Sequence, residues 1–139
     1  MKSAPTQDDP ALPESHPHKS RPGFARIWRA LWYSLEGLRS AWHLESAFRQ
    51  ELILALILFA VVLLLPASLT QKALLIACVM LVLITELLNS AVETTVDRIS
   101  LENHRLAKRA KDIGSAAVLL AMANLLLVWL LVLADVFSK

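Results

Sequence analysis

Residues 73–92 read ALLIACVMLVLITELLNSAV, and this stretch determines the fold that we expect. It is apolar apart from a few side chains, which include one charged residue, Glu86, and one amide, Asn89. A helix needs about 20 apolar residues to cross the hydrocarbon core of a bilayer. An acidic side chain inside a span is costly unless it faces a partner or a cavity. The stretch therefore predicts a transmembrane helix that carries a functional group.

Two further stretches are long and apolar enough to span a bilayer. Residues 52–69 are apolar almost throughout, and residues 113–136 follow a basic loop. We expect a short polar hairpin at residues 70–72 between the first two spans. The predicted fold class is an all-α integral membrane protein with three transmembrane helices, at about residues 49–69, 73–96 and 111–136.

An amphipathic pattern precedes the spans, at about residues 24–48. Apolar residues recur there at helical spacing along one face, which includes two tryptophans, while arginines lie on other faces. This pattern is typical of a helix that lies in the membrane interface, with its basic side chains toward anionic headgroups. A core helix of a soluble bundle is the alternative for this segment. The apolar face consists of Phe24, Ile27, Trp28, Leu31, Leu35, Leu38 and Trp42.

Composition supports lipid as the main solvent of the chain. Of the 139 residues, 56% are apolar and 19% are charged, and the mean hydropathy is +0.53. So short a chain has little interior in which to bury that much apolar surface. Its basic residues are segregated by position, which argues against a nucleic-acid partner. The single cysteine, Cys78, excludes an intrachain disulfide and a cysteine-based zinc site within one chain.

The first part of the chain differs in composition from the rest. Residues 1–23 are rich in Pro, Ser, His and charge, and they lack the apolar core of a secretory signal peptide. They predict a disordered cytoplasmic tail, followed by one membrane domain at residues 24–139. His16 and His18 are expected to be solvated rather than to bind a metal, so we assign the tail no chemistry.

The distribution of Lys and Arg predicts the orientation in the membrane. Seven of these residues lie at or before Arg49 and five lie between Arg98 and Lys111, whereas only Lys72 and Lys139 belong to the other side. Positive charge is enriched in cytoplasmic segments. The N-terminus and the second loop are therefore expected in the cytoplasm, and the hairpin and the C-terminus outside. Residues near position 45 would then share one membrane face with residues near 93–112.

Polar side chains of the middle span follow a helical row. Glu86, Asn89 and Glu93 are spaced i, i+3 and i+7, and Asp97 lies one turn further on, so all four share one side of a helix. Carboxylates at the cytoplasmic end of a span suit Mg²⁺, which prefers one or two carboxylates together with phosphate oxygens. Glu45 can supply a second ligand from another element. Hydrogen bonding between helices is the alternative role, and it applies mainly to Asn89 and Ser90.

A basic loop leads into the third span. Lys111 and Asp112 place a cation and an anion at the depth of the headgroups. For Arg105, Lys108 and Arg109 the orientation of the chain is a sufficient explanation. Carboxylates, a lysine and access to lipid suit phosphoryl transfer, which needs mainly positioning and charge neutralisation. The chain has no Walker or protein-kinase motif, so the residues alone leave a kinase and a small ion-coupled transporter open.

Three segments of the chain resemble the bacterial membrane-integral diacylglycerol kinases. They are GLRSAWHLESAFRQE at 37–51, ELLNSAVETTVDR at 86–98 and ENHRLAKRAKDIGSAAV at 102–118. The pattern E-x-x-N-S-A-x-E followed by R-A-K-D-x-G-S-A-A is specific, and the likeness runs from Phe24 to about Trp129. The resemblance implies a homotrimer of three-span protomers in the bacterial cytoplasmic membrane, with active sites shared between neighbouring subunits.

The resemblance also implies roles for single residues. Glu86 is similar to the general base of the family, and Glu45 and Glu93 are similar to its Mg²⁺ ligands. The positions similar to those that contact ATP are Arg26, Tyr33, Glu45, Glu93, Glu102, His104, Lys111 and Asp112. The positions similar to those that contact the lipid are Arg26, Trp42, Glu86, Asn89, Ser115 and Trp129.

By resemblance, the activity is transfer of the γ-phosphate of ATP to diacylglycerol, which gives phosphatidic acid in phospholipid recycling. One branch of the family phosphorylates undecaprenol instead, and the W-H-L-E-S-A-F-R-Q-E stretch at 42–51 resembles the diacylglycerol branch more closely. Undecaprenol kinase is therefore the first alternative. A non-enzymatic channel or transporter subunit, in which Glu86 would relay ions, is the second.

Overall fold

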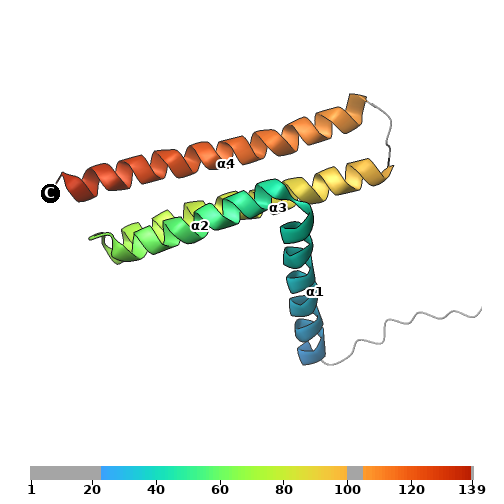
Figure 1. Cartoon of the computed structure of the whole chain (residues 1–139), viewed down its shortest axis with the longest axis horizontal. Helices are drawn as coiled ribbons and strands as arrows, with labels where there is room; N and C mark the ends of the chain where they lie inside the picture. Colours follow the sequence, from blue (N-terminus) through green and yellow to red (C-terminus); the bar gives the residue numbers. More distant parts are fainter. Residues whose placement is uncertain (1–22, 100–104, 139) are drawn as a thin grey trace, which may run out of the picture. The chain divides into compact units, whose positions relative to one another are not determined.

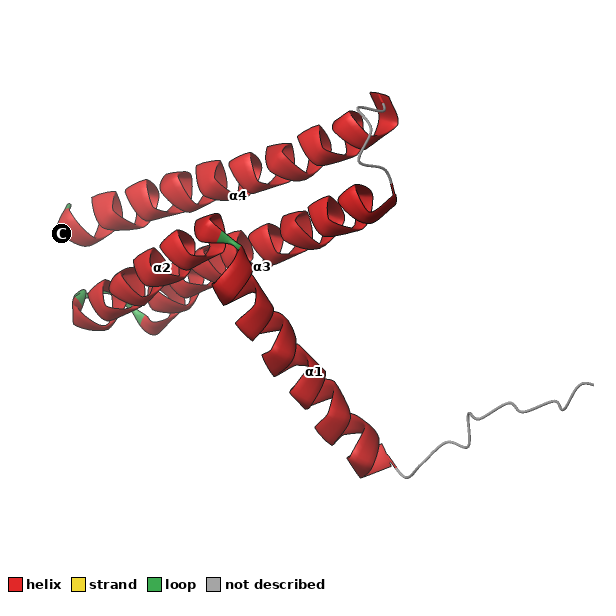
Figure 2. Cartoon of the chain, turned by 45° about the vertical axis from the view of Figure 1, so that its right-hand side comes forward, coloured by secondary structure: helices red, strands yellow, loops and turns green. Residues whose placement is uncertain are grey.

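The computed structural model describes residues 23–99 and 105–138, and these residues form four helices and no strand (Figure 2). The helices are α1 (Gly23–Leu44), α2 (Ser46–Leu64), α3 (Leu69–Ile99) and α4 (Arg105–Phe137). The predicted all-α fold class is confirmed. The tail expected at residues 1–23 lies outside the described residues except for its last position.

Three of the helices, α2, α3 and α4, are long and apolar enough to cross a membrane. Their most apolar windows have a mean hydropathy of 2.2, 2.2 and 2.6. Much of this apolar surface points away from the protein interior: Leu64 is 86% exposed, Leu120 71% and Leu130 67%. Lipid is the solvent that such outward faces require. The three predicted spans therefore correspond to three helices of the structure.

Helix α3 is the centre of the bundle. It packs most extensively against α4 and also packs against α2 (Figure 1). The most deeply buried side chains are Val62 of α2 and Leu75 and Val79 of α3. Because α3 is covered by both neighbours, its inward face is the place where a polar side chain is best screened from lipid.

The chain divides into two units, residues 1–34 and 35–139, and the first contributes the beginning of α1. The apolar side chains of this part of α1 are uncovered: Phe24 is 84% exposed, Ile27 68% and Trp28 64%. An uncovered apolar face agrees with the interfacial helix predicted for this segment.

The boundary between α1 and α2 falls at Glu45, whereas the sequence pattern continues the first helix to about residue 48. Glu45 has an extended backbone with φ −105° and ψ 112°, and its side chain does not cap α2. The Arg49 guanidinium donates hydrogen bonds to the carbonyls of Trp42 (3.0 Å) and His43 (3.2 Å). These carbonyls belong to the last turn of α1, where helix carbonyls lack partners. Arg49 thus stabilises the end of α1 and leaves the Glu45 carboxylate available.

The turn between α2 and α3 consists of residues 65–68, earlier than the hairpin expected at 70–72. Pro66 disfavours helix at the residue before it, so α2 ends there. Ser68 and Gln71 then form a capping box: the Ser68 amide donates to Gln71 Oε1 (2.8 Å) and the Gln71 amide to Ser68 Oγ (3.3 Å). Residues 69–72 are therefore the first turn of α3 rather than a polar loop.

Polar contacts also close the bundle at this end, which we call the hairpin end. Gln71 Nε2 donates to Asp135 Oδ2 of α4 at 2.7 Å. Lys72 Nζ donates to the carbonyl of Leu63 near the end of α2 at 3.1 Å. Together these bonds join the beginning of α3 to both of its neighbours.

Candidate active site

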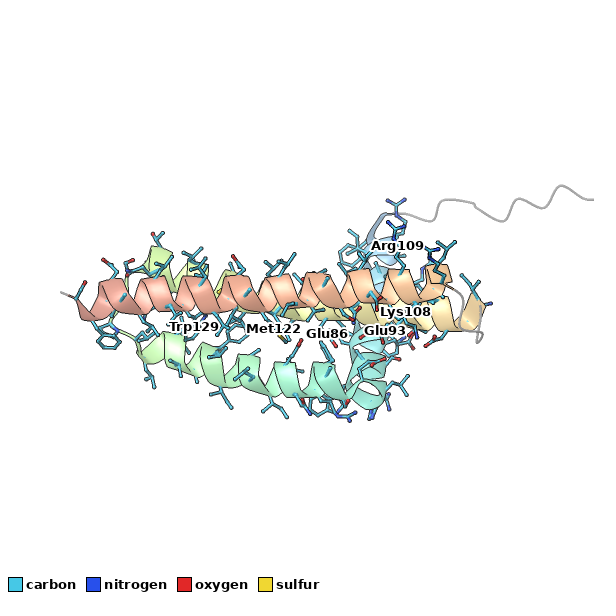
Figure 3. All side chains as sticks on the ribbon, turned by 90° about the horizontal axis from the view of Figure 1, so that it is seen from above. Glu86, Glu93, Lys108, Arg109, Met122 and Trp129 are labelled. Carbon is cyan, nitrogen blue, oxygen red and sulfur yellow. The ribbon has the colours of Figure 1, made fainter. Side chains whose placement is uncertain are left out.

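The row of carboxylates on α3 begins inside the bundle. Glu86 is only 6% exposed, although it is charged, and Ser90 one turn further along is 9% exposed. Glu86 and Glu93 both belong to α3, and Figure 3 shows Glu93 closer to the C-terminal end of this helix. Seven helical residues correspond to about 10 Å, so the two carboxylates lie at different depths. Glu86 is therefore the innermost acidic group of the row.

A second element brings its carboxylate to the same region. The charges of Glu93 and Glu45 both act on the carboxyl group of Glu86. Glu45 reaches this position from the extended link between α1 and α2, which is why the helix break matters for the site. Glu93 and Glu45 are thus near enough to Glu86 for their charges to act on it, although the three carboxylates do not converge on one point. Three like charges in one region repel one another unless a cation compensates them.

Asn89 lies between the two glutamates of the row. Its Nδ2 donates a hydrogen bond to Glu93 Oε1 at 3.2 Å. This bond occupies one oxygen of the carboxylate and leaves the other oxygen to a different partner. Asn89 therefore orients Glu93, in addition to any contact with the lipid that the sequence predicted.

The cation of the site comes from α4 and has a partner that sequence analysis missed. Lys111 Nζ forms an ion pair with Asp97 Oδ1 of α3 at 2.6 Å, and the Lys111 charge also interacts with Glu93. Asp112 pairs instead with Lys108 at 3.0 Å, on the exposed side of α4. The position of Asp97, one turn beyond Glu93, is the signal that could have identified this pairing.

Glu51 of α2 is a second group that sequence analysis left without a role. Its Oε2 atom is buried and has no hydrogen-bond partner among the described residues, and its carboxyl group interacts with the charge of Glu86. Glu51 also lies at a cavity of about 200 Å³. The rest of the lining is apolar and comes from all three spans: Leu54, Ala55, Leu58, Val79, Val82, Leu83, Met122, Leu125 and Leu126.

The lipid contacts predicted for Trp42, Ser115 and Trp129 are not tested by the structure. Trp129 is 9% exposed and belongs to the apolar core. Figure 3 shows it on α4, toward the C-terminus and away from Glu86 of α3. Trp42 is 39% exposed and Ser115 is also exposed. Their predicted lipid contacts stay predictions.

Four predicted ATP contacts cannot be placed with the carboxylates. Arg26 and Tyr33 belong to the unit formed by residues 1–34, whereas the carboxylates belong to the other unit. Glu102 and His104 lie outside the described residues. The roles of these four residues remain as the sequence predicted them.

The donor set of the site suits Mg²⁺ with phosphate. Within residues 23–99 and 105–138, no group of three or more His, Cys, Asp or Glu side chains could hold a metal on its own. Mg²⁺ does not require such a group, because it is commonly bound by one or two carboxylates, substrate phosphates and water. Glu45, whose carboxylate caps no helix, and Glu93 meet this description.

The fold and the site together define a small membrane-integral protein. In it, Asp97 and Glu93 of the middle span lie near Lys111 of the last span. The family model described as prokaryotic diacylglycerol kinase matches residues 32–133. The chain belongs to the prokaryotic diacylglycerol kinase family. This confirms the family to which the sequence motifs pointed, and the matched range contains the carboxylate row and Lys111.

Curated relatives agree with the family match. A diacylglycerol kinase of Pseudomonas aeruginosa is 48% identical over 117 residues, which cover 84% of this chain and 95% of the relative. One of Escherichia coli strain K12 is 49% identical over 116 residues, with the same two shares. One of Haemophilus influenzae is 47% identical over 107 residues, which cover 77% of this chain and 91% of the relative.

Proposed function

We propose that the chain transfers the γ-phosphate of ATP to the hydroxyl of diacylglycerol and so produces phosphatidic acid. Family membership makes it an ATP-using lipid kinase of the bacterial inner membrane. The observation that carries the mechanism is the burial of Glu86 within reach of the charges of Glu93 and Glu45. A buried carboxylate beside a cation-binding pair can act as a base next to a phosphate.

In this mechanism Glu86 accepts the proton of the lipid hydroxyl as its oxygen attacks the γ-phosphorus. The bond from that phosphorus to the bridging oxygen of ADP breaks, and ADP leaves. Glu86 suits the role because it lies deeper in the bundle than Glu93, further from the charged end of α3. The proton remains on Glu86 until the lipid product departs.

Glu45 and Glu93 would hold Mg²⁺, which, when bound, neutralises phosphate charge and orients the transferred group. Asn89 holds Glu93 by its hydrogen bond. Lys111 supplies a further positive charge for the phosphates, and Asp97 keeps its ammonium group on the side of α3. Arg26, Tyr33, Glu102, His104 and Asp112 are proposed to complete the ATP site.

We further propose a homotrimer with the N-terminus and the α3–α4 loop in the cytoplasm. Three spans are too few to surround a polar row in lipid, and the exposed apolar faces of the spans leave surface for neighbouring subunits. Trp42, Ser115 and Trp129 are proposed to contact the lipid substrate or its acyl chains.

The function can be tested with purified protein in mixed micelles. ATP labelled in the γ-phosphate should label diacylglycerol in a Mg²⁺-dependent reaction, and Glu86→Gln should serve as the inactive control. Faster labelling of undecaprenol than of diacylglycerol would establish the alternative substrate. Absence of labelled lipid with either substrate, in a folded sample, would overturn the kinase mechanism.

A further inference from the structure

Helices α3 and α4 approach each other closely at Gly114. A Cβ atom added at Gly114 would overlap Asn89 Oδ1 and would lie 3.3 Å from Asn89 Cγ and 3.9 Å from Asn89 Cα. At Gly23 and Gly37 an added Cβ would meet nothing within 4 Å. Gly114 therefore differs from the other glycines, because its lack of a side chain is needed by the Asn89 amide.

Glycine is an unfavourable residue at this position for the helix itself. Gly114 lies inside the 33-residue helix α4 and has no positive φ. Inside a helix, glycine costs about 1 kcal/mol relative to alanine. Backbone freedom does not explain it, since α4 continues unbroken through this residue. The space that Gly114 provides is the remaining explanation.

The nitrogen of the Asn89 side-chain amide forms a hydrogen bond, whereas its oxygen forms none within the described residues. Its Nδ2 donates to Glu93 Oε1, whereas its Oδ1 is buried and has no hydrogen-bond partner among the described residues. The Cα–H of Gly114 that takes the place of a side chain points at this oxygen. Such Cα–H···O contacts are common between closely packed helices. The contact favours the orientation in which the amide oxygen faces α4 and the NH₂ group faces Glu93.

We propose that Gly114 is a positioning residue for the metal-binding end of the site. By leaving room for the Asn89 amide, it keeps the NH₂ group on Glu93 Oε1 and so presents the other oxygen of Glu93 to a divalent cation. Gly114 touches neither ATP nor lipid in this role and acts through Asn89. The inference rests on the proposed role of Glu93 as a cation ligand.

An added methyl group could be accommodated in two ways, and both disturb the cation end. If the Asn89 side chain rotates away, the hydrogen bond to Glu93 is lost. If α4 moves away, Lys111 moves with it, because Lys111 lies three residues before Gly114 on the same side of the helix. The ion pair of Lys111 with Asp97 is then stretched.

The test uses Gly114→Ala, with Gly37→Ala as the matched control at a helical glycine that has open space. Binding of Mn²⁺ with a non-hydrolysable ATP analogue is measured by electron paramagnetic resonance, together with the Mg²⁺ dependence of lipid phosphorylation. Gly114→Ala should weaken Mn²⁺ binding about tenfold, the effect of one hydrogen bond to a charged group. The KM for diacylglycerol should change less than about twofold. An unchanged Mn²⁺ affinity in a folded Gly114→Ala protein would overturn the proposal.

A double-mutant cycle separates positioning from simple packing. Asn89→Ala should weaken Mn²⁺ binding as much as Gly114→Ala does, and adding Gly114→Ala to Asn89→Ala should cause no further loss. If Gly114→Ala does not fold, the double variant should fold, because the overlapping amide is gone. Additive losses, an unaltered Mn²⁺ affinity of Asn89→Ala, or a double variant that does not fold would each show that Gly114 only packs the helices.

The Glu93→Gln variant distinguishes two possible failures: that of the positioning role of Gly114 and that of the proposed cation site. If Glu93→Gln leaves Mn²⁺ affinity unchanged, then Glu93 is not a cation ligand, and the proposed site is wrong whatever Gly114 does. If Glu93→Gln weakens binding but Gly114→Ala and Asn89→Ala do not, only the positioning role is wrong.

Discussion

The two ends of the α3–α4 pair use polar groups in opposite ways. At the hairpin end, Gln71 and Asp135 bond to each other above an apolar core that contains Leu75, Val79 and Trp129. At the other end, which we call the carboxylate end, Glu86 is buried beside two further acidic groups. Satisfied polar groups and close packing stabilise a fold, whereas concentrated like charge costs stability unless a ligand compensates it. The comparison indicates that the hairpin end holds the bundle together and the carboxylate end carries out the chemistry.

Glu86→Gln should have the largest effect on activity. The amide keeps the size of the side chain but cannot accept the proton of the lipid hydroxyl, so turnover should fall by about a hundredfold or more. Affinity for Mg²⁺·ATP should change little, and the protein should not be destabilised, because one of several repelling charges is removed. Steady-state kinetics at saturating lipid, with thermal unfolding in detergent, measure both quantities. Near-normal turnover, with chemistry shown to limit the rate, would assign Glu86 to helix packing instead.

Glu93→Gln should act on the metal rather than on the proton. Loss of one carboxylate charge next to a divalent cation corresponds to about 2 kcal/mol, so the Mg²⁺ concentration for half-maximal activity should rise roughly thirtyfold. Raising Mg²⁺ should recover part of the activity, which it should not do for Glu86→Gln. A variant whose residual activity is insensitive to Mg²⁺, with normal nucleotide affinity, would remove Glu93 from the metal site.

Asp97→Asn should have a smaller effect, because the ion pair is partly exposed. The side chain of Lys111 is 36% exposed and that of Asp97 54%, and such pairs contribute up to about 1 kcal/mol. The KM for ATP should rise by up to about fivefold with kcat nearly unchanged, because Lys111 is no longer held on the α3 side. Lys108→Gln is the control: its pair with Asp112 is largely exposed, and the KM should change less than about twofold. Equal effects of the two substitutions would mean that only net charge matters.

The sequence was sufficient for the features that depend on composition and on helical spacing. The three spans follow from the length of the apolar stretches, and Glu86, Asn89 and Glu93 share one side of α3 because helical geometry places them there. The family followed from motifs that are continuous in the chain, and the family match confirms it.

Features that depend on contacts between helices were not predictable in the same way. The ends of α1 and α2 are set by Arg49 and by the Ser68–Gln71 capping box, whose side chains could also have faced solvent. Lys111 pairs with Asp97 rather than with Asp112 because α3 and α4 lie side by side. The distance between these two helices cannot be read from the sequence. The space at Gly114 likewise becomes visible only when Asn89 is placed opposite it.

Gln71→Ala should have the smallest effect, and it tests the hairpin end. Gln71 accepts a hydrogen bond from the Ser68 amide and donates one to Asp135 Oδ2, so the substitution removes part of a capping box and a bond between helices. Capping interactions contribute about 1 kcal/mol, and hydrogen bonds between transmembrane helices contribute similar amounts or less. The free energy of unfolding, measured by denaturation with an anionic detergent, should therefore fall by about 1 to 2 kcal/mol.

Thr70→Ala, at an exposed neighbouring position in the same helical turn, is the control and should have a smaller effect. Under conditions in which both variants are fully folded, kcat and the Mg²⁺ requirement should equal those of the unaltered protein, because Gln71 lies about 22 Å along α3 from Glu86. A reduced kcat in the folded Gln71→Ala protein would show that the two ends of the α3–α4 pair are coupled, and the division of labour between them would have to be abandoned.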